Sequence, residues 1–99
     1  MSDKKVLLML NQPPAECPLD RQLEVLSNAK EAGALLMQDA VFFAATDHGS
    51  RLLDAGVKVY ALRESVGARG LSDRVRPEVE LVSYDRVVDL IMEDYDMVL

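Results

Sequence analysis

The sequence has few of the residues that most often carry chemistry. It contains one cysteine, Cys17, and one histidine, His48. A single cysteine excludes a disulfide within the chain, and one cysteine with one histidine does not make the cluster that a zinc site requires. No glycine-rich phosphate loop follows any apolar run, which excludes P-loop and dinucleotide sites of the common kinds. We therefore expect neither a metal nor a cofactor.

Positive charge and long apolar runs are also scarce. The formal net charge is −6 at pH 7, whereas a protein that holds nucleic acid by itself needs a basic face. We therefore expect no direct contact with nucleic acid. No apolar stretch reaches the roughly 18 residues needed to cross a bilayer, and the first residues do not resemble a signal peptide. The sequence predicts a cytoplasmic protein without a membrane segment.

What the sequence does contain is the composition of a folded domain. Of its 99 residues, 49% are hydrophobic and 28% are charged, which is ordinary for a globular protein and too apolar for disorder. Tryptophan is absent and aromatic residues make up only 5%, so we expect a mostly aliphatic core. We expect a single domain over residues 1–99, small enough to be only marginally stable alone.

Apolar runs alternate with segments of helical spacing along the chain. Four runs have the composition of strands, namely residues 5–11, 34–37, 57–62 and 79–82. Helical segments lie between and after them, and residues 96–99 add a possible edge strand. This order predicts an α/β fold. We expect one three-layer domain, with a mainly parallel sheet of four or five strands and helices on both faces.

Capping residues set the expected limits of the helices. Pro18 suits the first residue of a helix that ends at Gly33. Asp39 suits the N-cap of a helix over residues 40–45, which is apolar nearly all round and is therefore expected to be buried by another chain. Ser83 caps the last helix. The apolar stripe expected on that helix consists of Tyr84, Val87, Val88, Ile91 and Tyr95.

The turn after the third strand is the first candidate site, because ligands of open parallel sheets bind at the carboxyl ends of strands. Arg63 and Arg69 flank this turn, and Gly70 suits a backbone conformation that other residues resist. The two arginines either bind an anion or a partner's carboxylate, or they pair with Glu64 and Asp73 on a solvated turn. Both interpretations stay open.

Cys17 and His48 are the remaining candidates for chemistry. If Pro18 begins the first helix, Cys17 is its N-cap, a place where a thiolate is stabilised and becomes nucleophilic. The nearby carboxylates of Glu16 and Asp20 oppose that thiolate. His48 lies in a polar turn and is either an acid–base group or only a turn residue. Of the two, Cys17 is the stronger candidate for a catalytic residue.

Three blocks in order give the chain a resemblance to a known family. They are ALLMQDAVFF at residues 34–43, KVYAL at 58–62 leading to ARG at 68–70, and VSY at 82–84 ahead of VVDL at 87–90. With these blocks the chain resembles the DsrH/TusB family, part of the DsrE-like superfamily of sulfur relay proteins. The resemblance extends over nearly the whole chain and implies the DsrE-like fold.

The resemblance implies a subunit of a sulfur relay complex. TusB-like subunits join two related subunits in a hexamer that passes persulfide sulfur toward the wobble uridine of certain tRNAs. DsrH-like subunits do the equivalent in sulfur-oxidation trafficking. The implied state is a homodimer or a hetero-oligomer with DsrE/DsrF (TusD/TusC)-like subunits, and both destinations of the sulfur stay open.

The resemblance also implies a non-catalytic subunit. In the sulfur-carrying sister subunit the reactive cysteine follows the third strand, shortly before an Arg-Gly pair, and the corresponding position here is Leu62. Many family members have a cysteine within the first helix, whereas residues 22–26 contain none and Cys17 lies earlier. The residues expected to meet a partner are Phe42, Phe43, Tyr60, Leu62, Arg63, Arg69 and Gly70.

Two other functions stay open. One is a sulfurtransferase that holds a persulfide on Cys17. The other is an unrelated small homo-oligomeric binding module with this fold, which uses Arg63 and Arg69 on an acidic ligand.

Overall fold

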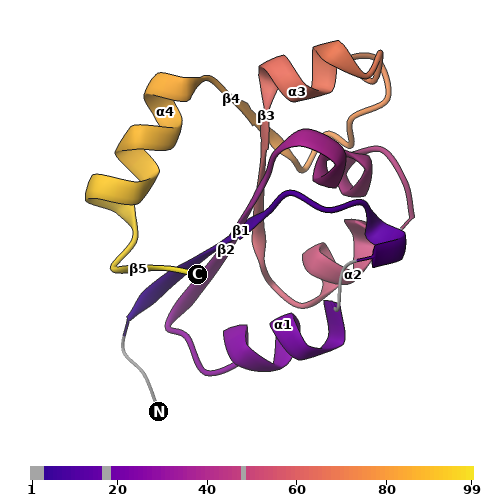
Figure 1. Cartoon of the computed structure of the whole chain (residues 1–99). Coiled ribbons are helices and arrows are strands. Elements are labelled where there is room, and N and C mark those ends of the chain that lie inside the picture. The colour runs from indigo at the N-terminus through magenta and orange to yellow at the C-terminus, as the bar shows by residue number, and fades with distance from the viewer. Residues whose placement is uncertain (1–3, 17–18, 48) are drawn as a thin grey trace.

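A five-stranded parallel sheet forms the middle of the structure, a computed structural model that describes residues 4–16, 19–47 and 49–99 (Figure 1). The order of the strands across the sheet is β4-β3-β2-β1-β5, and every neighbouring pair is parallel. The predicted parallel α/β sheet and its edge strand are confirmed. The strands are β1 (Lys5–Leu10), β2 (Glu31–Leu36), β3 (Lys58–Leu62), β4 (Glu80–Val82) and β5 (Met97–Val98).

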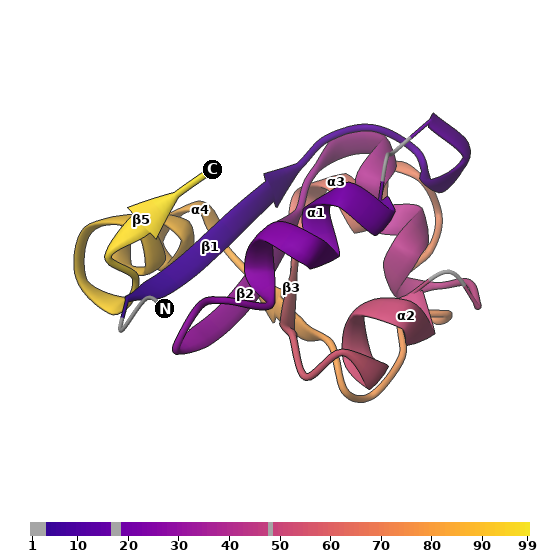
Figure 2. The ribbon, with the colours of Figure 1, turned by 90° about the horizontal axis from the view of Figure 1, so that it is seen from below.

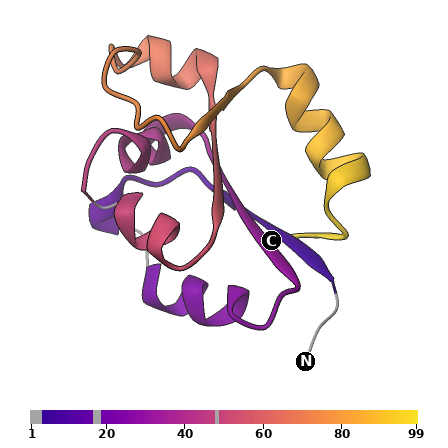
Figure 3. The ribbon, with the colours of Figure 1, turned by 180° about the vertical axis from the view of Figure 1, so that it is seen from behind.

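Helices cover both faces of the sheet, as predicted, but unevenly. One face is covered by several helices, and α4 lies alone on the other (Figures 1 and 3). Figure 2 shows α4 and β5 grouped on one side, with α1, α2 and α3 on the other. The α-helices are α1 (Leu19–Leu26), α2 (Gly49–Asp54), α3 (Arg63–Ala68) and α4 (Tyr84–Asp89). Short 3₁₀ helices η1 (Pro14–Glu16) and η2 (Gln38–Ala44) precede α1 and α2, and a π-helical turn η3 (Leu90–Asp94) extends α4.

Alternating strand side chains divide the core in two. On β1, Val6 and Leu8 belong to the larger core beneath α1, η2, α2 and α3. Leu7, which points the other way, belongs to a smaller core with Val87 and Leu90 from α4 and η3. The strands are nearly continuously apolar because both of their faces are covered.

The predicted role of Gly33 as a helix end is wrong. Helix α1 ends at Leu26, β2 begins at Glu31, and Gly33 lies within β2. A Cβ atom at this position would stand 2.3 Å from the hydroxyl oxygen of Tyr95. Gly33 is therefore explained by the close approach of a side chain to the strand and not by a cap. The predicted start of this helix at Pro18 falls outside the described residues.

The segment expected as a helix over residues 40–45 is the 3₁₀ helix η2, and the predicted N-cap is wrong. The capping residue is Met37, which makes no side-chain cap, whereas Asp39 lies inside η2. Its apolar side chains, including Val41 and Phe43, are buried within this chain by contacts with the sheet, α2 and α3. The expectation that a second chain buries this segment is also wrong, because the chain's own elements surround it.

The last helix matches its predicted cap but not its predicted stripe. The side chain of Ser83 accepts a hydrogen bond from the backbone N–H of Arg86, as expected of an N-cap. Val87 is buried and Leu90 is fully buried, but Tyr84 and Val88 are exposed. The predicted stripe is therefore wrong at Tyr84 and Val88, whereas Val87, Ile91 and Tyr95 do pack in the smaller core.

Candidate functional site

The candidate site lies at the carboxyl end of β3, where α3 follows the strand without a loop. Leu62 is the last residue of β3 and the N-cap residue of α3. Its side chain is 3% exposed and packs in the smaller core. The position at which the resemblance places the sister subunit's cysteine therefore holds a buried alkyl group, which has no nucleophile.

Arg69 is held by an acidic residue from another element. Its Nε donates to Oδ1 of Asp39 at 2.9 Å, and its Nη1 donates to the backbone oxygen of Ser65 at 3.3 Å. Of the two interpretations, the ion-paired one holds for Arg69, but the predicted partners Glu64 and Asp73 are wrong. Asp39 follows β2, and α3 follows β3. Because β2 and β3 are neighbours in the sheet, Asp39 lies next to α3. Asp39 is thus an ion-pair partner instead of a cap.

A second link joins the same two elements. The backbone N–H of Gln38 donates to the hydroxyl of Ser65 at 3.0 Å, and Ser65 is 8% exposed. Gln38 has a φ of 52°, a left-handed conformation that residues other than glycine rarely adopt. Together with the Arg69–Asp39 pair, this bond fixes the end of β2 to α3. Neither residue could be predicted from the sequence, because a serine and a glutamine that lie far apart form no recognisable motif.

The other predicted contact residues fall into two groups. Phe43, Tyr60 and Leu62 are 1%, 6% and 3% exposed and already fill the two cores. Arg63 is exposed and makes no hydrogen bond or ion pair within the part of the chain that the structure describes. Gly70 adopts a φ of 66°, which confirms the conformation expected of it. Contact of these residues with a partner stays a prediction, and Cys17 and His48 lie outside the described residues.

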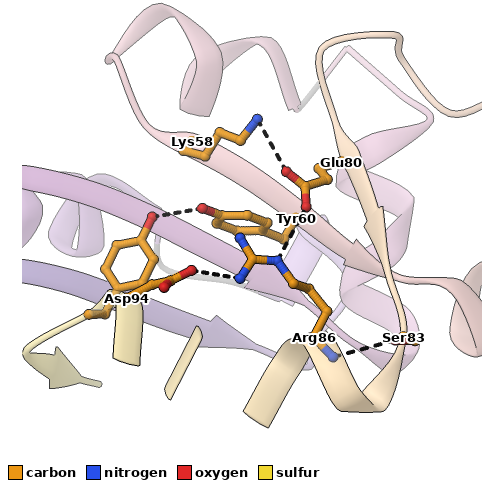
Figure 4. Close-up of polar contacts among 7 residues, drawn as sticks. Lys58, Tyr60, Glu80, Ser83, Arg86 and Asp94 are labelled. Atoms are coloured by element: carbon orange, nitrogen blue, oxygen red, sulfur yellow. Dashed lines mark hydrogen bonds and ion pairs between the residues drawn. The ribbon is translucent and has the colours of Figure 1, made fainter. Parts of the chain in front are cut away.

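Polar side chains at the opposite ends of the strands fix α4 and η3 to the sheet (Figure 4). Arg86 Nη1 donates to Oδ2 of Asp94 at 2.7 Å, and Arg86 Nε lies 3.6 Å from Oε2 of Glu80. Glu80 also lies 3.7 Å from Nζ of Lys58. The hydrogen bond from Asp94 raises the pKa of Arg86. The charges alternate and compensate one another, so this cluster supports the fold.

Two tyrosines lie beside that cluster. The hydroxyl oxygens of Tyr60 and Tyr95 are 3.1 Å apart, and their rings meet edge to face at 90°. Burial, followed by the hydrogen bond with Tyr60, raises the pKa of Tyr95 well above its ordinary value. Tyr95 is therefore a neutral phenol at physiological pH and not a base.

A cavity of about 560 Å³ opens next to the tyrosine pair. Lys58 and Glu31 also line it, and both already form ion pairs. The cavity lies at the amino ends of β2 and β3, away from Leu62. Across residues 4–16, 19–47 and 49–99, no three His, Cys, Asp or Glu side chains gather as metal ligands would. In the same ranges, no helix is long and apolar enough to cross a membrane.

Comparison with known proteins identifies relatives over most of the chain. The profile described as "DsrH like protein" matches residues 13–97. Protein TusB of Pectobacterium carotovorum subsp. carotovorum is 36% identical over 91 residues, which cover 89% of this chain and 93% of that protein. Protein TusB of Pectobacterium atrosepticum is 36% identical over 80 residues, or 77% of this chain and 84% of that protein.

Solved structures support the fold. The ychN protein from E. coli superposes with a TM-score of 0.77 at 20% identity, over 97% of each chain. The protein of unknown function MTH1491 from Methanobacterium thermoautotrophicum gives a TM-score of 0.67 at 19% identity, over 96% of this chain and 97% of that one. At these identities the similarity concerns the architecture alone.

Proposed function

The chain belongs to the DsrH family, and from that premise we propose that it is a non-catalytic subunit of a sulfur relay complex. Its relatives named TusB favour the branch that thiolates the wobble uridine of tRNA over sulfur-oxidation trafficking. It acts as a single domain in the cytoplasm and binds partner proteins. The acidic net charge of −6 leaves contact with tRNA to other subunits.

The observation that carries the non-catalytic role is Leu62. Persulfide transfer requires a thiolate that attacks and then carries sulfur. A buried leucine at the carboxyl end of β3 supplies neither a nucleophile nor access. The rival function, a sulfurtransferase acting through Cys17, lacks support from any described residue.

The frame around Leu62 supports a structural role in assembly. Gly70, the Arg69–Asp39 pair and the Ser65–Gln38 hydrogen bond hold the turn in one conformation. A fixed surface binds a partner with little loss of conformational freedom. Arg63 adds an exposed guanidinium suited to a partner's carboxylate.

The proposed partners are DsrE/DsrF (TusD/TusC)-like subunits, with a homodimer as the alternative state. The predicted contact residues that are not fully buried are Phe42, Arg63, Arg69 and Gly70. Phe43, Tyr60 and Leu62 support it from within the core.

The test is coexpression of this chain with the DsrE-like and DsrF-like proteins of the same genome, followed by light scattering of the purified sample. We expect one species that contains all three proteins. A chain that elutes as a monomer at high concentration, with neither protein bound, contradicts the proposal. Arg63→Glu should weaken the complex, whereas Arg74→Glu, a matched change at another exposed arginine, should not.

A further inference from the structure

Helix α4 and its extension η3 carry a row of apolar side chains that the chain leaves uncovered. Tyr84, Val88 and Met92 are 61%, 57% and 75% exposed. They follow one another at intervals of four residues, a spacing that stacks side chains along one side of a helix. We call these three residues the α4 ridge.

Carboxylates run beside the α4 ridge. Asp85, Asp89 and Glu93 each follow one ridge residue in sequence, and all three are exposed. Within the described ranges, none of these three side chains forms a hydrogen bond or an ion pair. Arg86, the one basic residue on α4, turns to the sheet and binds Asp94 and Glu80 (Figure 4). The ridge therefore has an acidic border without compensating charge.

The inner side of α4 already accounts for its place in the fold. Val87 and Leu90 fill the smaller core, Ser83 caps the helix, and Arg86 ties it to β4 and η3. Neither the α4 ridge nor the row of carboxylates beside it contributes to this attachment. Glu93 even opposes the helix dipole, because negative charge is unfavourable near a helix C-terminus.

We propose that the α4 ridge docks into an apolar groove on a partner subunit whose border carries lysine or arginine. An amphipathic helix that lays its anchors at i, i+4 and i+8 into a groove is a recurrent mode of recognition. The acidic border selects a basic partner, since complementary charge guides association and excludes like charge. This inference rests on the proposed function and adds a second contact surface to it, away from the turn at Arg69.

Charge argues against a second copy of this chain as the occupant. Two ridges packed together would bring two rows of carboxylates into one interface, and α4 offers only the already paired Arg86 to compensate them. The net charge of −6 adds to that repulsion. The occupant is thus a different protein, one of the DsrE-like or DsrF-like subunits.

Val25 provides a matched control. It is also a valine on a helix and is also 57% exposed. Its surroundings are the polar side chains of Arg21, Glu24 and Asn28, so it is a single exposed apolar residue of the kind common on protein surfaces.

The experiment compares Val88→Glu with Val25→Glu in the full chain. Each variant is titrated calorimetrically against the purified DsrE-like and DsrF-like proteins, and circular dichroism verifies that both variants fold. We expect Val88→Glu to raise Kd by about tenfold or more, as for a central contact residue, and Val25→Glu to leave it unchanged. We expect Asp89→Lys to weaken binding as well, and to reduce its dependence on salt.

The outcomes separate the two proposals. If the parent complex forms and both valine variants bind alike, the docking of the α4 ridge is wrong while the relay function stands. If the parent chain forms no complex, both fall. A homodimer of the parent that Val88→Glu dissociates would make a second copy the occupant and overturn the inference.

Discussion

Gly33 leaves room on β2 for the ring of Tyr95, whose hydroxyl reaches that of Tyr60. A Cβ at Gly33 would stand 2.3 Å from Tyr95 Oη and 2.7 Å from Cζ. The ring cannot withdraw freely, because Tyr95 Oη bonds Tyr60 Oη at 3.1 Å. At the residue scale, one absent side chain thus positions the end of η3 on the sheet.

Gly33→Ala should therefore destabilise the protein. We expect the free energy of unfolding in urea to fall by about 1–3 kcal/mol, as for other overpacked sites. Gly67→Ala is the control, because a Cβ there meets no heavy atom within 4 Å and the residue lies within α3. That change should stabilise by about 0.5–1 kcal/mol. A neutral or stabilising Gly33→Ala would refute the packing argument.

The raised pKa of Tyr95 predicts that the stability of the protein changes at alkaline pH. Burial raises its pKa in the folded state, whereas in the unfolded chain the phenol titrates near its ordinary value of about 10. Below that value the group is neutral in both states. Above it the unfolded chain releases the proton first, so stability falls as pH rises.

The expected result is a steeper loss of unfolding free energy above about pH 10 in the parent than in Tyr95→Phe. Lysines titrate in both proteins, so the difference between the two slopes isolates Tyr95. Equal slopes would show that Tyr95 does not couple folding to pH.

The residue-scale contacts show where sequence reasoning ends. Gly70 was predicted correctly, because a backbone requirement is local and only glycine meets it easily. The partner of Arg69 was not, because Asp39 is 30 positions away and the sheet brings the two together. The carboxylates nearest in sequence, Glu64 and Asp73, were the wrong guide.

At the scale of elements, α4 is fixed by its cap and by Arg86 before it presents any outer surface. The hydroxyl of Ser83 accepts from the N–H of Arg86 at 3.4 Å. Removing a cap of this kind frees the first turn of a helix and exposes an unpaired N–H group.

Ser83→Ala should lower the free energy of unfolding by about 0.5–1 kcal/mol, near the small end of cap effects because the bond is long. Hydrogen exchange should quicken at the start of α4. Ser72→Ala, in an exposed turn, should change stability by less than about 0.5 kcal/mol. Equal effects of the two substitutions would show that the side chain of Ser83 does not stabilise α4 as an N-cap.

Strands were easier to predict from the sequence than helix limits. A continuous apolar run is a strong sign of a strand covered on both faces, and β1 and β3 lie within one residue of their predicted limits. Gly33 misled the prediction because glycine suits both a helix end and a crowded strand. In α4 the predicted stripe took in the adjacent residues Val87 and Val88, but only Val87 is buried, because neighbouring side chains on a helix point in different directions.

At the scale of the molecule, the helices cover the two faces of the sheet unevenly. α4 alone covers one face and then leads to β5 on the far side of β1. The alternation of strands and helices predicted a parallel α/β sheet. It did not predict that α4 and η3 would cross one face of the sheet from β4 at one edge to β5 at the other. That crossing explains why no element that the structure describes packs on the exposed side of α4.

The buried alkyl side chain of Leu62 has a consequence for the proposed complex as a whole. In the proposed function, another subunit of the assembly carries the sulfur and this chain contributes through its contacts. The surfaces that we propose for these contacts are the turn around Arg69 and the α4 ridge.

The most direct test of the non-catalytic role is mass spectrometry of the assembled complex after loading with a persulfide donor. We expect a DsrE-like or DsrF-like subunit to gain the mass of sulfur while the mass of this chain stays unchanged. We also expect Cys17→Ala to leave the loading of the complex unaltered. Sulfur found on this chain, and lost in Cys17→Ala, would contradict the account and establish a sulfur carrier.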